Sequence, residues 1–193
     1  MFEFENQLNW AADFKLATRQ IRGAEIRSEL KIQQIAAPKD VAENALAFSA
    51  ETHHGEGNDH ADHGTGRLVI LRNTDAVDSW GGRTRIICFA KSPLESNIGS
   101  GESMAEIAWS WLADSLHQRQ ASYSNEAGTA TRILSTGFGS LAHETDHAQL
   151  EVRASWTPDG EELGRHFEAW QDLLCMMAGL PHLPAGVAHL GRN

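Results

Sequence analysis

Two short apolar runs limit what this chain can fold into more than any other feature of its sequence. The segments GRLVILRN (66–73) and RTRIICFAK (83–91) carry apolar residues at consecutive positions, and the turn-forming segment TDAVDSWGG (74–82) joins them. Such runs are far too short to cross a bilayer, and they are typical of strands covered on both faces. They predict two neighbouring strands at the centre of a sheet.

Four further segments have the pattern of strands. They are RSELKIQQI (27–35), NALAFSAET (44–52), GTATRILSTGFG (128–139) and AQLEVRASW (148–156). The last of these alternates apolar and polar side chains at every position, which predicts one buried and one solvated face. The second of them follows a turn at Pro38.

Three segments have the apolar spacing of amphipathic helices. The first spans 8–21, with Asn6 as a cap and Gly23 as a stop; the second follows the capping box SMAE (103–106); the third begins around TPDGEE (157–162) and ends at Gly179. Their apolar stripes are Trp10, Phe14, Ala17 and Ile21; Met104, Ile107, Ala108, Trp111 and Leu112; and Leu163, Phe167, Trp170, Leu174 and Met177.

The order of these segments, α-β-β-β-β-α-β-β-α, predicts an α+β fold. Strands joined by short connections pair antiparallel, with the three helices gathered on one side of the sheet. No repeat or Pro-rich linker divides the 193 residues, so we expect a single domain over 1–193, with a flexible His-rich loop at 52–66 and a C-terminal tail at 180–193. The order is also similar to the type III secretion chaperone-like fold, whose members bind partner chains.

Charge and cysteine content bear on partners and compartment. The net charge is −10, from 26 acidic and 16 basic side chains, and no run of Lys or Arg is present. This argues against direct nucleic-acid binding, although a basic groove assembled in three dimensions stays compatible with it. Cys88 and Cys175 lie in apolar runs, which predicts buried, reduced thiols and a cytoplasmic protein. The N-terminal MFEFENQLNW has no signal-peptide pattern, so neither secretion nor membrane insertion is expected.

The segment HETDH (143–147) spells the zinc-protease pattern H-E-x-x-H, in which two histidines one helical turn apart bind the metal. Here residues 140–149 lie between two predicted strands and lack an apolar stripe, and Thr and Asp occupy the central positions. This composition favours a hairpin connection over a helix. A zinc-dependent hydrolase that uses His143, Glu144 and His147 is therefore an alternative hypothesis.

A second group of metal ligands lies in the segment 51–66. It contains His53, His54, His60 and His63 together with several carboxylates. Imidazoles suit zinc, nickel or copper, but four glycines and no apolar anchor make the segment costly to order. We expect no resident cofactor, and zinc or nickel binding is the alternative.

Motifs for other chemistry are missing, and the tryptophans fall into two groups. GFGSL (137–141) lacks the second glycine of G-x-S-x-G, and no phosphate-binding or dinucleotide-binding glycine motif occurs. The sequence therefore leans away from an enzyme. Most of the six tryptophans lie on predicted apolar faces, whereas Trp109 falls off its helical stripe and Trp80 lies in a turn. We interpret Trp80 and Trp109 as candidate binding residues.

Five blocks carry a family resemblance: GRLVILRN, AEIAWSWLADSL (105–116), GTATRILSTGFGSL (128–141), VRASWTP (152–158) and HFEAWQDLLCMMAGLPHLPAGV (166–187). Through them the chain resembles, over nearly its whole length, an actinobacterial family known as domain of unknown function 3000. The resemblance implies a cytoplasmic setting and supplies no catalytic residues. Members are often encoded beside a ribonuclease-D-like exonuclease, which implies an accessory role in RNA metabolism.

The sequence leaves three functional hypotheses. The favoured one is a non-enzymatic cytosolic interaction or adaptor protein that binds a partner protein through a sheet edge or an aromatic patch, with a homodimer as a variant of the same idea. The second is an accessory factor in RNA metabolism. The third is a metal-binding protein or zinc-dependent hydrolase that uses the two His-containing segments.

Overall fold

The computed structural model describes residues 12–53, 64–94, 104–142 and 147–180. In this part of the chain, three α-helices and six strands follow the predicted order, so the α+β class is confirmed. The strands are β1 (Leu30–Ile35), β2 (Asn44–Thr52), β3 (Thr65–Val77), β4 (Gly82–Leu94), β5 (Tyr123–Ser135) and β6 (His147–Pro158). The helices are α1 (Ala12–Gly23), α2 (Met104–Gln118) and α3 (Leu163–Met177), with a short 3-10 helix, η1 (Gly139–Leu141).

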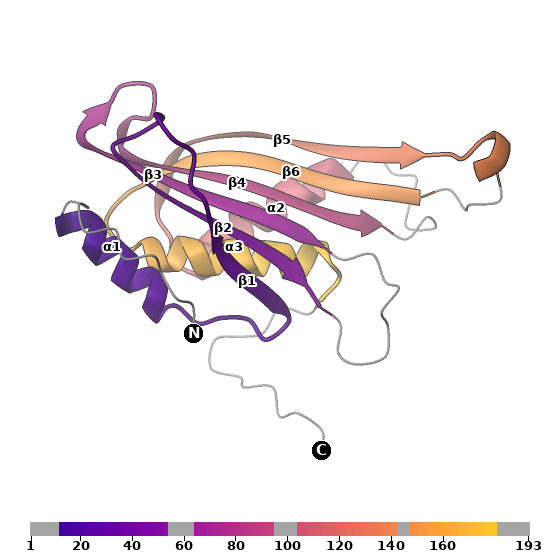
Figure 1. The fold of residues 1–193 in the computed structure, drawn as a ribbon, viewed down its shortest axis with the longest axis horizontal. Coiled ribbons are helices and arrows are strands. Elements are labelled where there is room, and N and C mark those ends of the chain that lie inside the picture. Colours follow the sequence, from indigo (N-terminus) through magenta and orange to yellow (C-terminus); the bar gives the residue numbers. More distant parts are fainter. Residues whose placement is uncertain (1–11, 54–63, 95–103, 143–146, 181–193) are drawn as a thin grey trace, which may run out of the picture.

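The strands form one antiparallel sheet in the order β1-β2-β3-β4-β6-β5 (Figure 1). The first four strands are neighbours in both sequence and space. The chain then passes through α2, β5 takes an outer position, and β6 returns between β4 and β5. The two edges of the sheet are therefore β1 and β5.

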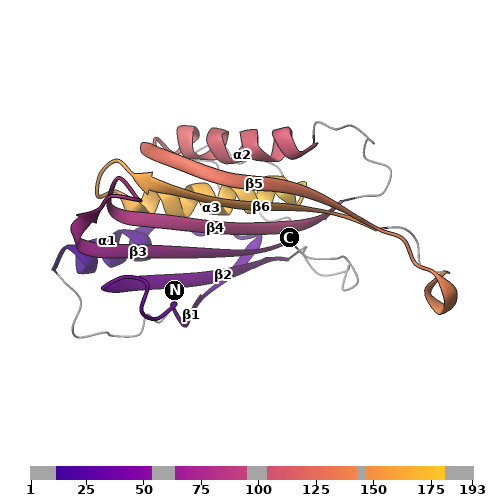
Figure 2. The ribbon, with the colours of Figure 1, turned by 90° about the horizontal axis from the view of Figure 1, so that it is seen from above.

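The helices lie on one side of the sheet, here called the inner face (Figures 1 and 2). Helix α3 packs between α1 and α2 and contacts β3, β4 and β6, while α2 covers β5 and part of β6. The predicted stripe of α3 is fully buried, and the ring centroid of Phe167 lies 5.0 Å from that of Phe48 on β2. Together with Trp156 of β6, this stripe forms the centre of the hydrophobic core.

The prediction that the central strands are covered on both faces was wrong. Within the described residues no helix or strand lies over the opposite face, here called the outer face, and Ile87 of β4 is 42% exposed there. Consecutive residues of a strand point to opposite sides, so each apolar run places some side chains in the core and others on the outer face. Leu68 and Ile70 enter the core, whereas Val69 lies on the outer face.

Several predicted boundaries shift. Thr52 ends β2 and Thr65 begins β3, so the connection between them is shorter than the predicted loop at 52–66. Helix α1 reaches Gly23, and β5 begins at Tyr123, before the predicted segment. The described structure does not include residues 1–11, with Asn6 and Trp10, nor 95–103, with the capping serine, nor the tail at 181–193. None of the three helices, as described, combines the length and the apolar character that a bilayer-spanning helix requires.

Gly66 determines how closely α3 approaches β3. A Cβ atom added at this position would lie 2.5 Å from Cδ2 of Leu174, whose side chain is 2% exposed and has little room to move. We expect Gly66→Val to lower the free energy of unfolding by about 1–3 kcal/mol, because overpacking forces the helix or the strand to shift. Urea denaturation measures the change. Gly23→Ala is the control, because nothing lies within 4 Å of its added Cβ; equal stability losses in the two variants would contradict this account.

Candidate functional site

The predicted metal ligands are only partly described. His53 is exposed, and its backbone N–H donates to the carbonyl of Glu29. His147 is the exposed first residue of β6 and faces Ser135 of β5 in the sheet register. His54, His60, His63, His143 and Glu144 lie outside the described residues. Among the described residues, no three His, Cys, Asp or Glu side chains converge as metal ligands, so metal binding stays a prediction.

The two tryptophans proposed for binding lie in different surroundings. Trp80 is half-buried in the β3–β4 turn, and its carbonyl accepts hydrogen bonds from the Asn125 amide and the Thr157 hydroxyl. Trp109 packs partly against the core, where Gly128 of β5 makes room for its ring. Trp109 thus contributes to the packing of α2 on β5, and a binding role for either residue stays a prediction.

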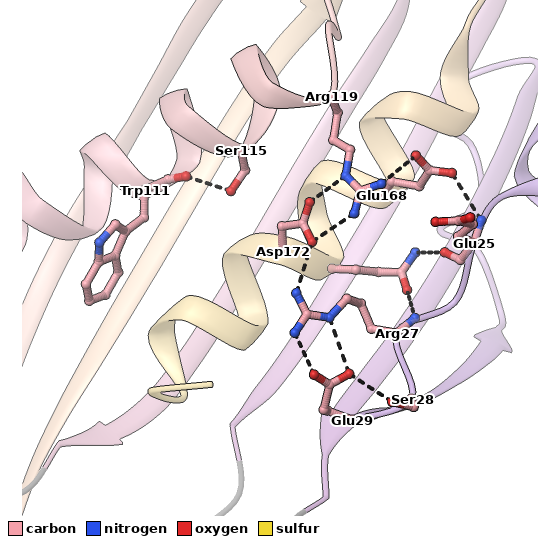
Figure 3. A network of polar contacts seen from close by, with 10 residues as sticks. Glu25, Arg27, Ser28, Glu29, Trp111, Ser115, Arg119, Glu168 and Asp172 are labelled. Atoms are coloured by element: carbon pink, nitrogen blue, oxygen red, sulfur yellow. Dashed lines mark hydrogen bonds and ion pairs between the residues drawn. The ribbon is translucent and has the colours of Figure 1, made fainter. Parts of the chain in front are cut away.

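A cluster of charged and polar side chains surrounds Asp172 of α3 (Figure 3). The Asp172 side chain is fully buried, and its carboxylate accepts from two guanidinium groups. Arg119, just after α2, donates from Nε at 2.6 Å and from Nη2 at 3.1 Å, and Arg27, just before β1, donates from Nη1 at 3.3 Å. Glu29 pairs with Arg27 at 2.6 Å and Glu168 pairs with Arg119 at 3.2 Å.

The charges of this cluster satisfy one another. Burial alone disfavours the charge on Arg27, but its hydrogen bonds and charge interactions with Glu29 and Asp172 outweigh that effect and raise the pKa of Arg27. The hydrogen bond to Asp172 likewise raises the pKa of Arg119 against the effect of burial. For Glu29, burial raises the pKa, but bonds from Arg27 and neighbouring groups bring it below the ordinary value.

The Asp172 cluster is therefore a structural clamp. It joins α3, the end of α2 and the segment that leads from α1 into β1, and the buried Gln171 amide adds bonds to the backbone of Glu25 and Arg27. An acid–base catalyst needs a pKa near the working pH and access to a substrate. The pKa values of Arg27 and Arg119 are raised and that of Glu29 is lowered, so these three groups are moved away from neutral pH and do not meet the first condition.

A small cavity beside His166 is the second candidate. It has a volume of about 50 Å³ and is lined by Gln120, Ala121, Ser122, Asp159, Gly160, Glu162 and His166. Binding sites for small molecules usually exceed about 300 Å³, so the cavity holds only one or two water molecules. His166 accepts a hydrogen bond at Nδ1 from Trp156 Nε1 at 3.1 Å, and burial lowers its pKa to about 4. Such a group is a poor general base at neutral pH.

The outer face of the sheet is the third candidate, and it carries an excess of basic residues. The sheet register assigns Lys31, Arg67, Arg85, Lys91 and Arg153 to this face, against Glu51 and Glu151. Lys31 faces Glu51 across β1 and β2, and Lys91 faces Glu151 across β4 and β6. Beyond these two opposed pairs, three arginines remain on the face, in a chain whose net charge is −10.

An apolar row crosses the outer face between these arginines. Ile35, Ala47, Val69 and Ile87 occupy directly opposed positions on β1, β2, β3 and β4. A second row lies two residues further along the strands and consists of Arg67, Phe89 and Arg153 on β3, β4 and β6. The guanidinium carbon of Arg153 lies 5.3 Å from the Phe89 ring centroid. In the other direction along β4, Arg85 lies two residues before Ile87.

The three arginines of the outer face differ in their partners. Arg153 pairs with Glu151 at 2.6 Å. Arg85 donates to the carbonyl of Asn125 at 2.8 Å and to the hydroxyls of Ser155 and Thr157 at 2.7 and 3.1 Å, and burial lowers its pKa. Among the described residues, neither Arg85 nor Arg67 forms an ion pair with a carboxylate. The outer face therefore offers a hydrophobic row flanked by two cations that lack a counter-charge there. Within this row Ile87 is 42% exposed, Ile35 and Val69 are half-buried, and Ala47 is buried.

Sequence reasoning did not find this face. Its residues come from separate strands, and only the register of the sheet brings them into rows. The alternation RTRIICF in β4 contained a partial signal, because Arg85, Ile87 and Phe89 share one side of a strand. The consecutive apolar residues of the same run, Ile86, Ile87 and Cys88, are instead typical of a strand covered on both faces.

Removing the Asp172 carboxylate should destabilise the protein strongly. In Asp172→Ala, two partly buried guanidinium groups lose their shared partner, and we expect a loss of about 3–5 kcal/mol in the free energy of unfolding. The exposed pair of Arg165 and Glu162, with side chains 40% and 64% exposed, provides the control. Glu162→Ala should cost less than about 1 kcal/mol. Denaturant titration of both variants checks this, and similar losses would show that the clamp is dispensable.

Protonation of His166 should make stability depend on pH. Its folded-state pKa of about 4 lies below its ordinary value of 6.5, so the unfolded chain binds the proton more tightly between these pH values. The contribution of neutral His166 to the free energy of unfolding is therefore complete above pH 6.5. It is lost as the pH falls toward 4, by up to about 3 kcal/mol. His166→Gln keeps an acceptor for Trp156 but cannot titrate. Denaturation of both proteins from pH 7 to pH 4 should give diverging profiles, and parallel profiles would contradict the prediction.

Comparisons with known proteins add a family assignment. Neither the comparison with curated proteins nor the comparison with solved structures found a match, so the similarity to the type III secretion chaperone-like fold stays a prediction. Residues 10–188 match the family described as "Protein of unknown function (DUF3000)". This match spans most of the chain and includes the five sequence blocks that carry the resemblance. The chain belongs to the DUF3000 family.

Proposed function

We propose that this protein is a non-enzymatic binding protein whose outer sheet face holds an amphipathic helix with acidic flanks from a partner protein. The observation that carries the proposal is the apolar row on β1 to β4, bordered by Arg67 and Arg85, which meet no carboxylate among the described residues. A sheet face with apolar side chains is stabilised when another element covers it.

Charge complementarity selects the partner. Val69 and Ile87 would contact the apolar stripe of the helix, and carboxylates on its two flanks would meet Arg67 on one side and Arg85 on the other. A helix that covers this face would remove water from the two guanidinium groups, which is costly for a cation without a counter-charge. Carboxylates on the helix would offset that cost. Complementary charges also raise the rate of encounter with an acidic partner.

Single-stranded RNA is a second candidate, and the row of Arg67, Phe89 and Arg153 favours it. A ring between two arginines on a sheet surface offers stacking and phosphate contacts. However, Phe89 is the one aromatic side chain on the paired part of this face in the described structure. Sheet platforms for RNA usually stack two or three bases, and the apolar row has no counterpart in such a role. These points favour a protein partner.

We also propose that the protein works in the cytoplasm. Cys88 and Cys175 are unpaired and buried, and burial raises the pKa of each thiol to about 12. Such thiols behave as small apolar side chains, as expected in a reducing compartment.

Binding by the outer face should depend on Arg67. The probe is a fluorescent peptide with leucines at helical spacing and glutamates on both flanks. We expect Arg67→Glu to weaken its binding about tenfold or more, because attraction becomes repulsion at the edge of the apolar row. Fluorescence anisotropy titrations at two salt concentrations measure the affinity, and the wild-type affinity should fall at the higher salt concentration.

Matched controls separate this effect from a general change in charge. Arg19→Glu introduces the same charge change at an exposed position of α1 and should leave binding unchanged. A peptide with lysines in place of the glutamates should not bind. If the acidic peptide does not bind, or if both variants weaken it equally, the proposal fails. Binding of a short oligouridylate in its place would support the RNA candidate.

A further inference from the structure

We propose that two copies of this chain associate through their β5 edges, in antiparallel register about Thr129, so that the sheets of both copies become continuous. This proposal is independent of the outer-face function, since it concerns the edge of the sheet and a second copy of the same chain.

β5 is an edge strand with little protection. In Figure 1 it borders the sheet, and no described helix or strand lies beyond it. Proteins usually protect such edges with short strands, lysines, prolines or bulges. The opposite edge, β1, is six residues long and carries Lys31. β5 has thirteen residues, and its one irregularity lies between Ser124 and Ala127. From 127 to 135 it contains neither lysine nor proline, and most of its residues are exposed.

The charges of β5 are complementary to a second copy of the same strand. Its charged residues are Glu126 and Arg132, which lie at equal distances in sequence on either side of Thr129. In a two-fold antiparallel pair centred on Thr129, each Glu126 therefore faces the Arg132 of the other copy. Opposite charges directly across a strand pair stabilise it, whereas like charges destabilise it.

Two further observations agree with this pairing. Arg132 is half-buried and forms no ion pair with a carboxylate among the described residues, so Glu126 of a second copy would supply its missing counter-charge. An apolar arm also continues from the end of β5 into η1. Its members are Ile133, Leu134, Phe138 and Leu141, which are 37%, 66%, 80% and 51% exposed. Antiparallel pairing brings each arm along the start of the partner's β5, near half-buried Tyr123.

The first experiment is sedimentation equilibrium of the full chain over a range of concentrations. The wild-type protein should be a dimer. Arg132→Glu should raise the dimer dissociation constant about tenfold or more, because two attractive pairs become repulsive. Glu126→Arg should have the same effect, and the double variant Glu126→Arg, Arg132→Glu should restore the dimer. The restored dimer also shows that the single variants did not simply misfold.

The second experiment tests the register. The residue on the two-fold axis faces its own copy, so thiols introduced by Thr129→Cys should form an intermolecular disulfide under mild oxidation. Thr131 faces Ala127 of the partner in this register, so Thr131→Cys should cross-link more slowly. Buried Cys88 and Cys175 should not interfere.

Each contrary result overturns the proposal. A wild-type protein that stays monomeric at all concentrations removes the interface altogether. A dimer that is unaffected by either charge reversal, or that the double variant fails to restore, excludes the pairing of Glu126 with Arg132. Faster cross-linking through Thr131→Cys than through Thr129→Cys excludes the register.

Discussion

The packing of α3 against the inner face of the sheet is the contact on which the rest of the structure depends. Its apolar stripe, with Phe167, Trp170 and Leu174, fills the core between the sheet and the other two helices. Helix α3 cannot approach β3 without the space at Gly66, and it cannot bury Asp172 without Arg27 and Arg119. The Asp172 clamp thus fixes the position of the helix that the core requires.

The one-sided arrangement of the helices explains where binding surfaces arise. All three helices lie on the inner face, so the outer face and the β5 edge stay open in the described structure. The chain is acidic overall, yet its outer face has more basic than acidic residues. The net charge of the chain therefore does not predict which partners this face attracts, because strand pairing gathers basic residues that are dispersed in the sequence.

Local patterns were enough to predict most of the elements. The period of two in AQLEVRASW and the apolar stripe at Leu163, Phe167, Trp170 and Leu174 are visible in short windows, and both were confirmed. The candidate sites were harder to predict. Arg27 lies 145 residues from Asp172, and Arg119 lies 53 residues from it, so no window of the sequence contains the clamp. The apolar row on the outer face likewise takes one residue from each of four strands.

By itself the sequence determined the order of helices and strands and most of the residues that enter the core, because backbone geometry fixes the spacing of apolar side chains within each element. Only the tertiary structure decided which face of the sheet stays uncovered, which strand forms the long edge, and which charges meet. Those outcomes depend on the pairing of strands and on the side to which the helices turn. Both are set by contacts between residues far apart in the chain, which local periodicity does not encode.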